Sequence, residues 1–339
     1  MKVPKWGRFA VSSCVGASIL IVVVKWVGVG RIVEVLGRLN PVWLAPAIAL
    51  SLTAPVFRAA RWKLLLNPLG SISLRRLTSA VILGSLANTL APARTGEFLR
   101  ALLIRGQGDV RFTSGLSSIF AERVLDVLAL LGLSAAGLAT AQVTLPAMFL
   151  NALRVVGALF VALTALIIFA AKKGGLTLSA LRAVERMFPE RVRSRLTGQV
   201  ELAVKGVEAL NEEPKTILSI SILTVVVWLV PAASTILLFK AFSVEMSPGA
   251  VTLGYALHSL SFAIPAPPGY AGTFEVYWAL IYSNLGMRFE EALALGLTVH
   301  VISLLTTAAL GSLALSPLNP GKMIEVVQRG GERIFKFHR

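Results

Sequence analysis

The chain is poor in charge, in cysteine and in motifs for redox, metal or nucleotide chemistry. Charged residues make up 15% of its 339 residues, whereas 55% are hydrophobic, and the mean hydropathy is +0.76. A chain of this composition has too few charged residues to cover the water-exposed surface of a soluble domain. The single cysteine, Cys14, excludes an intrachain disulfide, and no Cys/His spacing typical of zinc is present. Without a G-x-x-x-x-G-K-[ST] pattern, ATP is excluded as an internal energy source. We therefore predict an integral membrane protein without a cofactor.

Apolar runs of the length that crosses a bilayer recur along the whole sequence. About 20 residues of helix span the hydrocarbon core, and the runs lack the alternation of a membrane barrel. Because lipid offers no partners to backbone groups, these runs predict an all-α protein. The first run, from Phe9 to Val24, follows Lys2, Lys5 and Arg8 but precedes no A-x-A-like cleavage site. It is interpreted as an uncleaved span.

Positive charge gathers at the ends of the apolar runs. The net charge of +16 therefore indicates membrane topology rather than nucleic-acid binding. Basic residues are dense in 58–76, 172–215 and 322–339 and sparse in the remaining connections. By the positive-inside rule, we expect a multi-pass protein of the cell membrane with both termini in the cytoplasm.

This charge pattern fixes a path for the chain. Six full crossings are expected at 9–27, 39–57, 112–139, 150–171, 215–240 and 291–315. Segments 77–107 and 250–286 must each begin and end on one side, and Pro and Gly interrupt both. We predict two oppositely oriented re-entrant helical hairpins. Their breaks lie at Pro92, Gly96, Pro268, Gly269 and Gly272.

The two interrupted segments also resemble each other. LGSLANTLAPARTGEF from Leu83 and LHSLSFAIPAPPGYAGTFE from Leu257 share a leading Leu-x-Ser-Leu, a proline-rich break and a closing Gly and Glu. We therefore predict one transmembrane domain with an inverted-topology repeat, and a substrate site near the midplane. Two ordinary kinked pairs of spans are the alternative. The predicted units are a first repeat 39–139, a cytoplasmic loop 172–214, a second repeat 215–315 and a basic tail 316–339.

Ionisable residues are expected deep inside two of the spans. Glu122, Arg123 and Asp126 lie about ten or more residues into the span that starts near 112, and His300 lies about nine residues into the last span. Glu122 and Asp126 share a helical face, and Arg123 and Asp126 can pair locally. Intramembrane charges normally face a partner or a polar cavity. The group is therefore either a structural ion pair or part of a substrate site, and His300 is either a packing residue or a site residue. His258 has less support.

Charge also accompanies the first break. On a helix that starts near Thr95, Glu97 and Arg100 share a face, and Arg94 lies beside the unpaired N–H groups of the helix N-terminus. Such a terminus suits phosphate, although a Glu–Arg pair also neutralises itself.

A basic cluster follows the second span. Arg58, Arg61 and Lys63, with Trp62 between them, are interpreted as interfacial anchors or as collectors of an anionic lipid headgroup.

Four ordered motifs carry a family resemblance. RAARW at 58–62, NTLAPARTGEFLR at 88–100, AERVLD at 121–126 and PAPPGYAGTFE at 265–275 resemble the flippase-like transmembrane family of lysylphosphatidylglycerol synthases, over nearly the whole chain. The resemblance implies movement of phospholipid or polyprenyl-linked lipid between leaflets. The family's synthases add a soluble transferase domain, whereas this chain ends about 25 residues after its last expected span. We therefore expect no lysyl-lipid synthesis. Tyr270 replaces a residue that is usually small in the family, which leaves the lipid open.

The leading hypothesis is a lipid translocase, not an enzyme, that holds a phosphate-bearing headgroup between the hairpins. Its expected partners are membrane lipids, with a homo-oligomer or a lipid-synthesising enzyme left open. A secondary transporter of a small anion, a membrane enzyme using Glu122 or His300 as acid or base, and a non-catalytic partner of such an enzyme are the alternatives. The candidate substrate-binding residues are Arg61, Asn88, Arg94, Glu97, Arg100, Glu122, Arg123, Asp126, Glu275 and His300.

Overall fold

A computed structural model describes six stretches of the chain. They are residues 39–67, 71–90, 95–107, 110–141, 214–264 and 266–315, with isolated positions in 30–37 and 147–165. The expected spans 9–27 and 150–171, the loop 172–214 and the tail 316–339 fall essentially outside these stretches. So do Pro92 and Arg94.

Every regular element in these stretches is helical. In chain order they are α3 (Pro41–Leu66), α4 (Leu74–Leu90), α5 (Thr95–Ile104), α6 (Phe112–Thr140), α10 (Pro214–Ala241), α11 (Pro248–Ser261), the short 3₁₀ helix η2 (Pro268–Tyr270), α12 (Thr273–Asn284) and α13 (Phe289–Leu315). The predicted all-helical class is confirmed for the part of the chain that is described.

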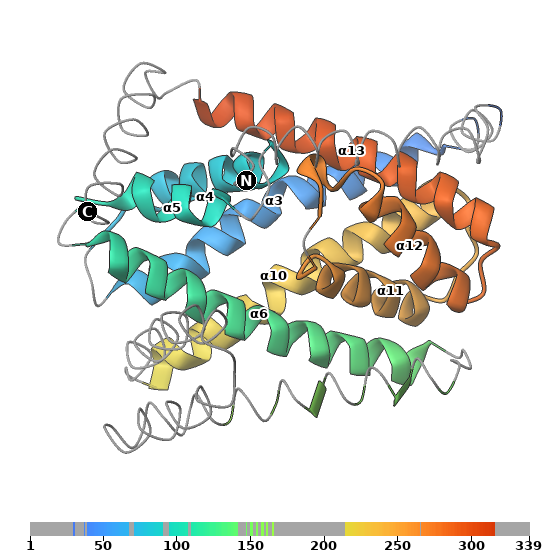
Figure 1. The fold of residues 1–339 in the computed structure, drawn as a ribbon, viewed down its shortest axis with the longest axis horizontal. Helices are drawn as coiled ribbons and strands as arrows, with labels where there is room; N and C mark the ends of the chain where they lie inside the picture. The colour runs from blue at the N-terminus through green and yellow to red at the C-terminus, as the bar shows by residue number, and fades with distance from the viewer. Residues whose placement is uncertain are drawn as a thin grey trace, which may run out of the picture.

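Three of the helices are long and apolar enough to cross a membrane. They are Pro41–Leu66, Lys215–Ala241 and Phe289–Ala314. α6 has 29 residues, about 43 Å of helix, but Glu122, Arg123 and Asp126 interrupt its apolar sequence. Figure 1 shows these long helices extending along the molecule, with α13 and α6 on opposite sides of α3 and α10.

α3 is longer than the predicted span 39–57. It starts with a side-chain cap, in which the Asn40 Oδ1 accepts the Val42 N–H at 2.9 Å, and it continues to Leu66. The prediction ended the span before Arg58 because charged residues usually mark a loop. That boundary was wrong, because Arg61 and Trp62 are 1% and 0% exposed and extend the helix into the protein interior.

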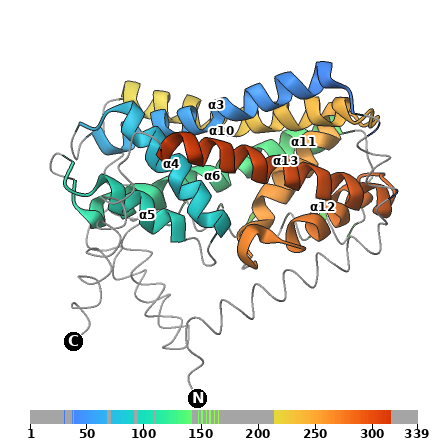
Figure 2. The ribbon, with the colours of Figure 1, turned by 90° about the horizontal axis from the view of Figure 1, so that it is seen from above.

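α4 with α5, and α11 with α12, form two helical hairpins. Arg76 near the start of α4 hydrogen-bonds to Gln107 just after α5. At the other hairpin, the Tyr282 hydroxyl near the end of α12 donates to the Val251 carbonyl near the start of α11 at 3.1 Å. Each hairpin therefore returns to the level at which it began. Figure 2 shows the α4–α5 pair at one end of the molecule and the α11–α12 pair at the other.

Glycine permits the closest contact inside the first hairpin. A Cβ on Gly96 would lie 1.8 Å from the Gly84 carbonyl oxygen, and one on Gly84 would lie 2.5 Å from the Arg100 side chain. The Gly96 N–H also donates to the Asn88 Oδ1 at 2.8 Å. α5 therefore packs against the backbone of α4 with its first turn tied to the end of α4.

The break of the second hairpin lies against the end of α4. Gly269, with a φ of +67°, faces the Thr89 carbonyl of α4, and η2 packs against α4. Gly269 and Gly272 both have positive φ, which glycine adopts without strain. These contacts place the interrupted backbone of the second hairpin beside the C-terminal end of α4.

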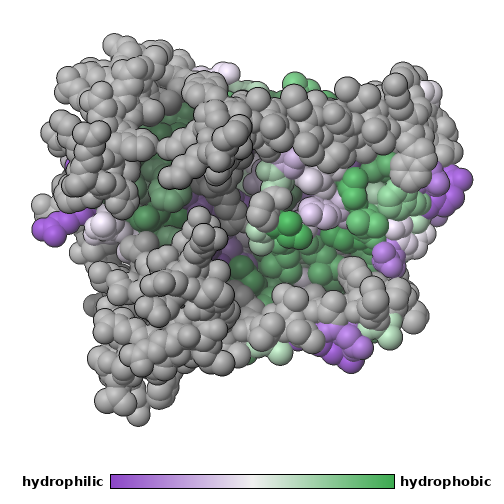
Figure 3. Space-filling model, in the orientation of Figure 1, coloured by the Kyte–Doolittle hydropathy of each residue, from purple (hydrophilic) through white to green (hydrophobic). Residues whose placement is uncertain are grey.

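Large apolar side chains cover much of the outer surface. Val42, Leu90, Leu218, Leu305 and Leu313 are all more than 60% exposed. In Figure 3 green apolar atoms fill much of the described surface on one face, and the strongly hydrophilic residues lie toward its margins. Continuous exposed apolar surface of this kind is expected of a chain that is solvated by lipid.

Candidate functional site

Four buried charged side chains and the partly exposed Arg123 form an ion cluster where α3, α5 and α6 meet. The Arg61 guanidinium lies 2.7 Å from Asp126 and 3.4 Å from Glu122. Arg100 reaches the other oxygen of Glu122 at 2.6 Å. Arg123 lies 3.3 Å from Asp126, which is the local pair predicted from their spacing. The cluster therefore joins three helices through alternating charges.

Two tryptophans contact charged groups of this cluster. The Trp228 Nε1 on α10 donates to Asp126 at 2.9 Å, so a fourth helix joins the ion cluster. The Arg100 guanidinium lies over the Trp62 ring at 4.1 Å, where the negative face of the ring attracts a cation. Trp62 in turn donates to the Ser118 Oγ at 2.9 Å. These contacts join Asp126 and Arg100 to neighbouring tryptophan rings.

Charge in the cluster is balanced. Glu97 at the start of α5 forms an ion pair with Arg123 at 3.1 Å, so three arginines face Glu97, Glu122 and Asp126. Burying ions is costly unless each has a partner, and this arrangement gives one to every ion. Arg61 is therefore part of the protein interior and not an interfacial anchor, which corrects that interpretation of the basic cluster.

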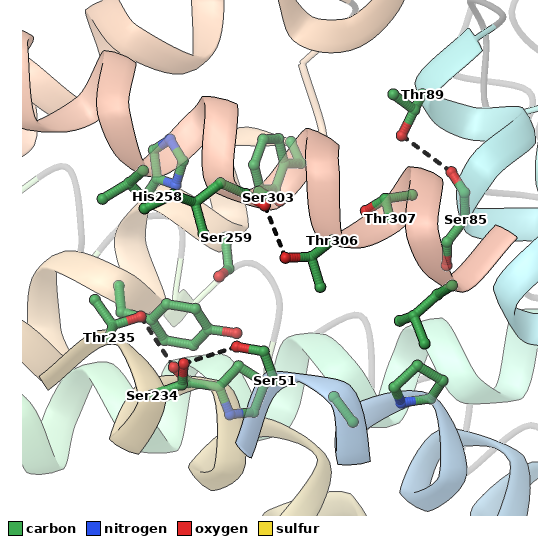
Figure 4. A pocket seen from close by; sticks show the side chains of 18 of the residues that line it. Ser51, Ser85, Thr89, Ser234, Thr235, His258, Ser259, Ser303, Thr306 and Thr307 are labelled. Carbon is green, nitrogen blue, oxygen red and sulfur yellow. Dashed lines mark hydrogen bonds between the residues drawn. The ribbon is translucent and has the colours of Figure 1, made fainter. Parts of the chain in front are cut away.

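A cavity of about 440 Å³ lies beside the ion cluster. Its wall comes from α3, α4, α10, α11, η2, α12 and α13, so both hairpins contribute to it. Figure 4 shows the labelled side chains converging from several of these helices. The volume is in the range of known small-molecule sites.

Hydroxyl groups dominate the polar part of the cavity wall. Ser51 and Ser234 hydrogen-bond to each other at 2.7 Å, and Figure 4 shows them on one side of the cavity. Several other hydroxyls donate to their own helix, as Thr306 does to the Ile302 carbonyl, and such a hydroxyl keeps its lone pairs as acceptors. The hydroxyl residues on the wall are Ser51, Ser85, Thr89, Ser234, Thr235, Tyr255, Ser259, Tyr270, Ser303, Thr306 and Thr307.

Arg58 brings a cation to this wall. Its guanidinium lies 5.2 Å from the centre of the Trp228 ring. The described wall residues include no Asp or Glu, and the carboxylate that interacts with Arg58 electrostatically is Asp126 of the ion cluster, behind the wall. The cavity therefore combines one arginine with neutral hydrogen-bonding groups. That chemistry suits a ligand with an anionic group and hydroxyls.

A second buried pair lies between α12 and α13. The His300 Nδ1 lies 2.7 Å from the Glu275 Oε1, and Glu275 is 0% exposed. The second carboxylate oxygen of Glu275 has no hydrogen-bond partner. Phe274 stacks on the His300 ring at 4.2 Å between centroids and itself lines the cavity.

The predicted site residues thus divide between three places. Arg61, Arg100, Glu122, Arg123 and Asp126 lie in the ion cluster with Glu97; Glu275 and His300 form the second pair; Asn88 lines the cavity. Arg94 lies outside the described residues, and the bond from Gly96 to Asn88 takes up one donor of the proposed phosphate-binding helix terminus.

Sequence reasoning missed most of the cavity wall. Arg58 appeared only as a possible anchor or headgroup collector, and His258, which lines the cavity, was set aside. The hydroxyl residues gave no signal, because Ser and Thr are common in membrane helices and bond to their own backbone. The pairing of Ser51 on α3 with Ser234 on α10 depends on packing that no local pattern encodes.

Together, the long apolar helices, the exposed apolar surface and the buried ions define an integral membrane protein with an internal polar cavity. Residues 7–311 match the model of the lysylphosphatidylglycerol synthase TM region, so the chain belongs to that family. The resemblance drawn from the four motifs is confirmed.

Curated relatives with full-length coverage are archaeal membrane proteins. A UPF0104 membrane protein of Methanothermobacter thermautotrophicus is 25% identical over 305 residues, covering 87% of this chain and 89% of that protein. Another, from Methanocaldococcus jannaschii, is 22% identical over 305 residues, covering 87% and 90%. Glycosyltransferase AglD of Haloferax volcanii is 24% identical over 318 residues, which are 85% of this chain and 51% of AglD. No solved structure matches the chain.

Proposed function

We propose that this chain is a lipid translocase that holds a phosphate-bearing headgroup in the cavity while the acyl or prenyl chains stay in the surrounding lipid. The observation that carries the proposal is the cavity wall, in which Arg58 is accompanied by hydroxyls and by no described carboxylate. One guanidinium offsets one phosphate. The hydroxyls match an uncharged, hydroxyl-bearing remainder of the headgroup.

The ion cluster has a supporting role in this proposal. Arg100 and Arg123, first considered as ligands for the headgroup, are already neutralised by Glu122, Glu97 and Asp126. They hold α5 and α6 against α3 and thereby position Arg58, three residues before Arg61 on α3. We therefore assign recognition of the anion to Arg58 in the cavity and not to the arginines of the ion cluster.

The architecture that we propose is an inverted-topology repeat. α3 to α6 form one half and α10 to α13 the other, and each half holds a broken hairpin between two long helices. The four hairpin helices have 17, 10, 14 and 12 residues, about 15–26 Å each, so none spans ~30 Å of hydrocarbon fully. Both hairpins return to their starting level, as expected of re-entrant segments that enter from opposite sides of the cell membrane.

A second function is favoured by one relative. AglD carries the name glycosyltransferase, so this chain could act as the membrane partner of a separate lipid-modifying enzyme rather than move lipid itself. Such a partner would bind the headgroup in the same cavity but would not raise the rate of leaflet exchange. A transporter of a small soluble anion would move inorganic phosphate without lipid.

The test is leaflet exchange in liposomes with Arg58→Gln, Arg58→Lys and the control Arg288→Gln. Arg288 is 71% exposed and does not line the cavity. We expect Arg58→Gln to slow exchange of a phosphate-bearing fluorescent lipid roughly ten-fold or more, since a charge-assisted contact contributes about 1.5–3 kcal/mol. Arg58→Lys keeps the charge but loses the planar pair of N–H donors of the guanidinium. Its exchange rate should therefore lie between those of the parent and of Arg58→Gln. Equal rates in all variants would contradict the proposed site.

A further inference from the structure

Two acid–base pairs, Glu97–Arg123 and Glu275–His300, occupy equivalent positions in the two halves of the chain. Glu97 is the third residue of α5, which starts at Thr95, and Glu275 is the third residue of α12, which starts at Thr273. Their partners also correspond. Arg123 is the twelfth residue of α6, counted from Phe112, and His300 is the twelfth residue of α13, counted from Phe289.

The two halves differ in the base at this position. A guanidinium keeps its proton at every physiological pH, whereas an imidazole gains and loses one there. The Glu97–Arg123 pair is therefore a fixed ion pair. The Glu275–His300 pair instead combines a carboxylate with an imidazole. In the described ion cluster, the carboxylates are matched by arginines. The pair whose base is able to exchange a proton therefore lies in the second half.

In the described structure, His300 is the group that offsets the charge of Glu275. Glu275 and His300 are 0% and 5% exposed, and the Glu275 Oε2 has no hydrogen-bond partner. The elements packed on α12 and α13 are α11, α3 and α4, and Phe239 of α10 contacts Trp278 and Tyr282 of α12. The other ionisable groups of these elements in the described stretches are Tyr255, His258, Arg58, Arg61, Lys63, Arg75, Arg76, Lys215 and Lys240, joined on α12 and α13 by Tyr277, Tyr282, Glu290 and Glu291.

Among the described residues, the ion pair that Glu275 forms within 4.0 Å is with His300. None of the other charged groups named above pairs with it. The pair is thus neutral with one proton, anionic with none and cationic with two. A net charge buried without a counter-ion is costly. The number of protons on the pair therefore depends on the charge of whatever occupies the neighbouring cavity.

The pair is linked to the cavity through one side chain. Phe274 stacks on His300 with an interplanar angle of 7°, and its carbonyl lies 3.2 Å from the His258 Nε2. Phe274, His258 and Val299, which precedes His300, all line the cavity. A change in the charge or tilt of His300 therefore reaches the cavity wall directly.

We infer that the Glu275–His300 pair is the proton-binding site that couples headgroup movement to a proton gradient, an inference that rests on the proposed function. An anionic headgroup in the cavity favours the proton on the pair by Coulomb attraction in a low-dielectric interior. The proton is taken from the aqueous phase on one side and released to the other when the headgroup leaves. Anionic lipid and proton then move in the same direction, and no other reactant is consumed.

The experiment compares His300→Arg with the parent in liposomes that carry an imposed pH gradient. His300→Arg gives the second half the fixed pair of the first half. With one proton per lipid, a gradient of one pH unit is worth about 1.4 kcal/mol, so it shifts the leaflet ratio of an anionic fluorescent lipid up to roughly ten-fold in the parent. We expect the leaflet ratio in His300→Arg to be the same with and without the gradient, because a guanidinium neither takes up nor releases a proton at these pH values. Arg288→Gln, at a side chain that is 71% exposed and does not line the cavity, is the control and should respond like the parent.

Infrared difference spectra provide a second measurement that does not require transport. Because His300→Arg could fold poorly, Glu275→Gln is examined as well. An infrared protonation band, of imidazolium or of carboxyl, that appears on lowering the pH in the parent and is lost in Glu275→Gln supports the site; the same band in both proteins, or no band in the parent, overturns it. A parent that moves lipid but ignores the gradient overturns the coupling and leaves the proposed function standing. A parent that moves no lipid overturns the proposed function, and the coupling with it.

Discussion

Removing one charge from the ion cluster should cost far more than removing a matched pair. Arg61 and Asp126 are suited to this test, because their side chains are 2% and 6% exposed and 2.7 Å apart. Asp126→Asn keeps the shape and the acceptor for the Trp228 Nε1 but leaves three arginines against two carboxylates. Arg61→Gln leaves the opposite imbalance.

The magnitude follows from the burial of the pair. Breaking a buried ion pair on one side costs about 3–5 kcal/mol, because an uncompensated charge remains. Each single variant should therefore lower the ratio of folded to unfolded protein by roughly a hundred-fold to several thousand-fold. The double variant Arg61→Gln/Asp126→Asn restores neutrality. We expect its loss to be smaller than the sum of the two single losses by at least about 2 kcal/mol.

Reversible unfolding in mixed micelles provides the assay, with the four proteins measured at one pH and one detergent concentration. Any volume lost in Arg61→Gln is common to the single and double variants, so it cancels in the cycle. Additive losses would refute the interpretation of the cluster as a charge-balanced scaffold. If the double variant is as stable as the parent but translocates no lipid, the pair also has a functional role.

Two further predictions concern the hairpins. Gly96→Ala should destabilise the protein by several kcal/mol and reduce the folded yield in detergent, because its Cβ would lie 1.8 Å from the Gly84 carbonyl; Gly132→Ala, which has open space around its Cβ position, is the control and should behave like the parent. In a Cys14→Ser background, cysteines at Arg76 and Gln107 should both react with an impermeant thiol reagent from the cytoplasm, and one at Arg288 from outside. Labelling of positions 76 and 107 from opposite sides would exclude a re-entrant first hairpin.

Helix positions could be predicted from the sequence to a large extent. The expected hairpin 250–286 corresponds to α11, η2 and α12, and the expected span 112–139 corresponds to α6. Strong signals made this possible: long apolar runs, prolines and glycines at the breaks, and basic residues at the ends. The end of α3 was missed because a buried arginine and a loop arginine look the same in sequence.

The site was predicted only in part. The local Arg123–Asp126 pair follows from helical spacing. The bridge from Arg61 to both acidic residues joins positions 61 residues apart or more, so it depends on how α3 packs against α6. Arg123 and His300 occupy equivalent helix positions, but this correspondence is seen only when α6 and α13 are aligned from the first residues that the structure gives them.

Leaflet exchange by the unmodified protein tests the central claim most directly. Purified protein is reconstituted into liposomes that contain fluorescent lipids with an anionic phosphate headgroup, or with an aminoacylated cationic one. Quenching from outside then reports how much lipid reaches the outer leaflet. The account predicts fast exchange of the anionic lipid and slow exchange of the cationic one, because Arg58 lies on a cavity wall with no described carboxylate. Exchange no faster than in protein-free liposomes, or faster exchange of the cationic lipid, would contradict it.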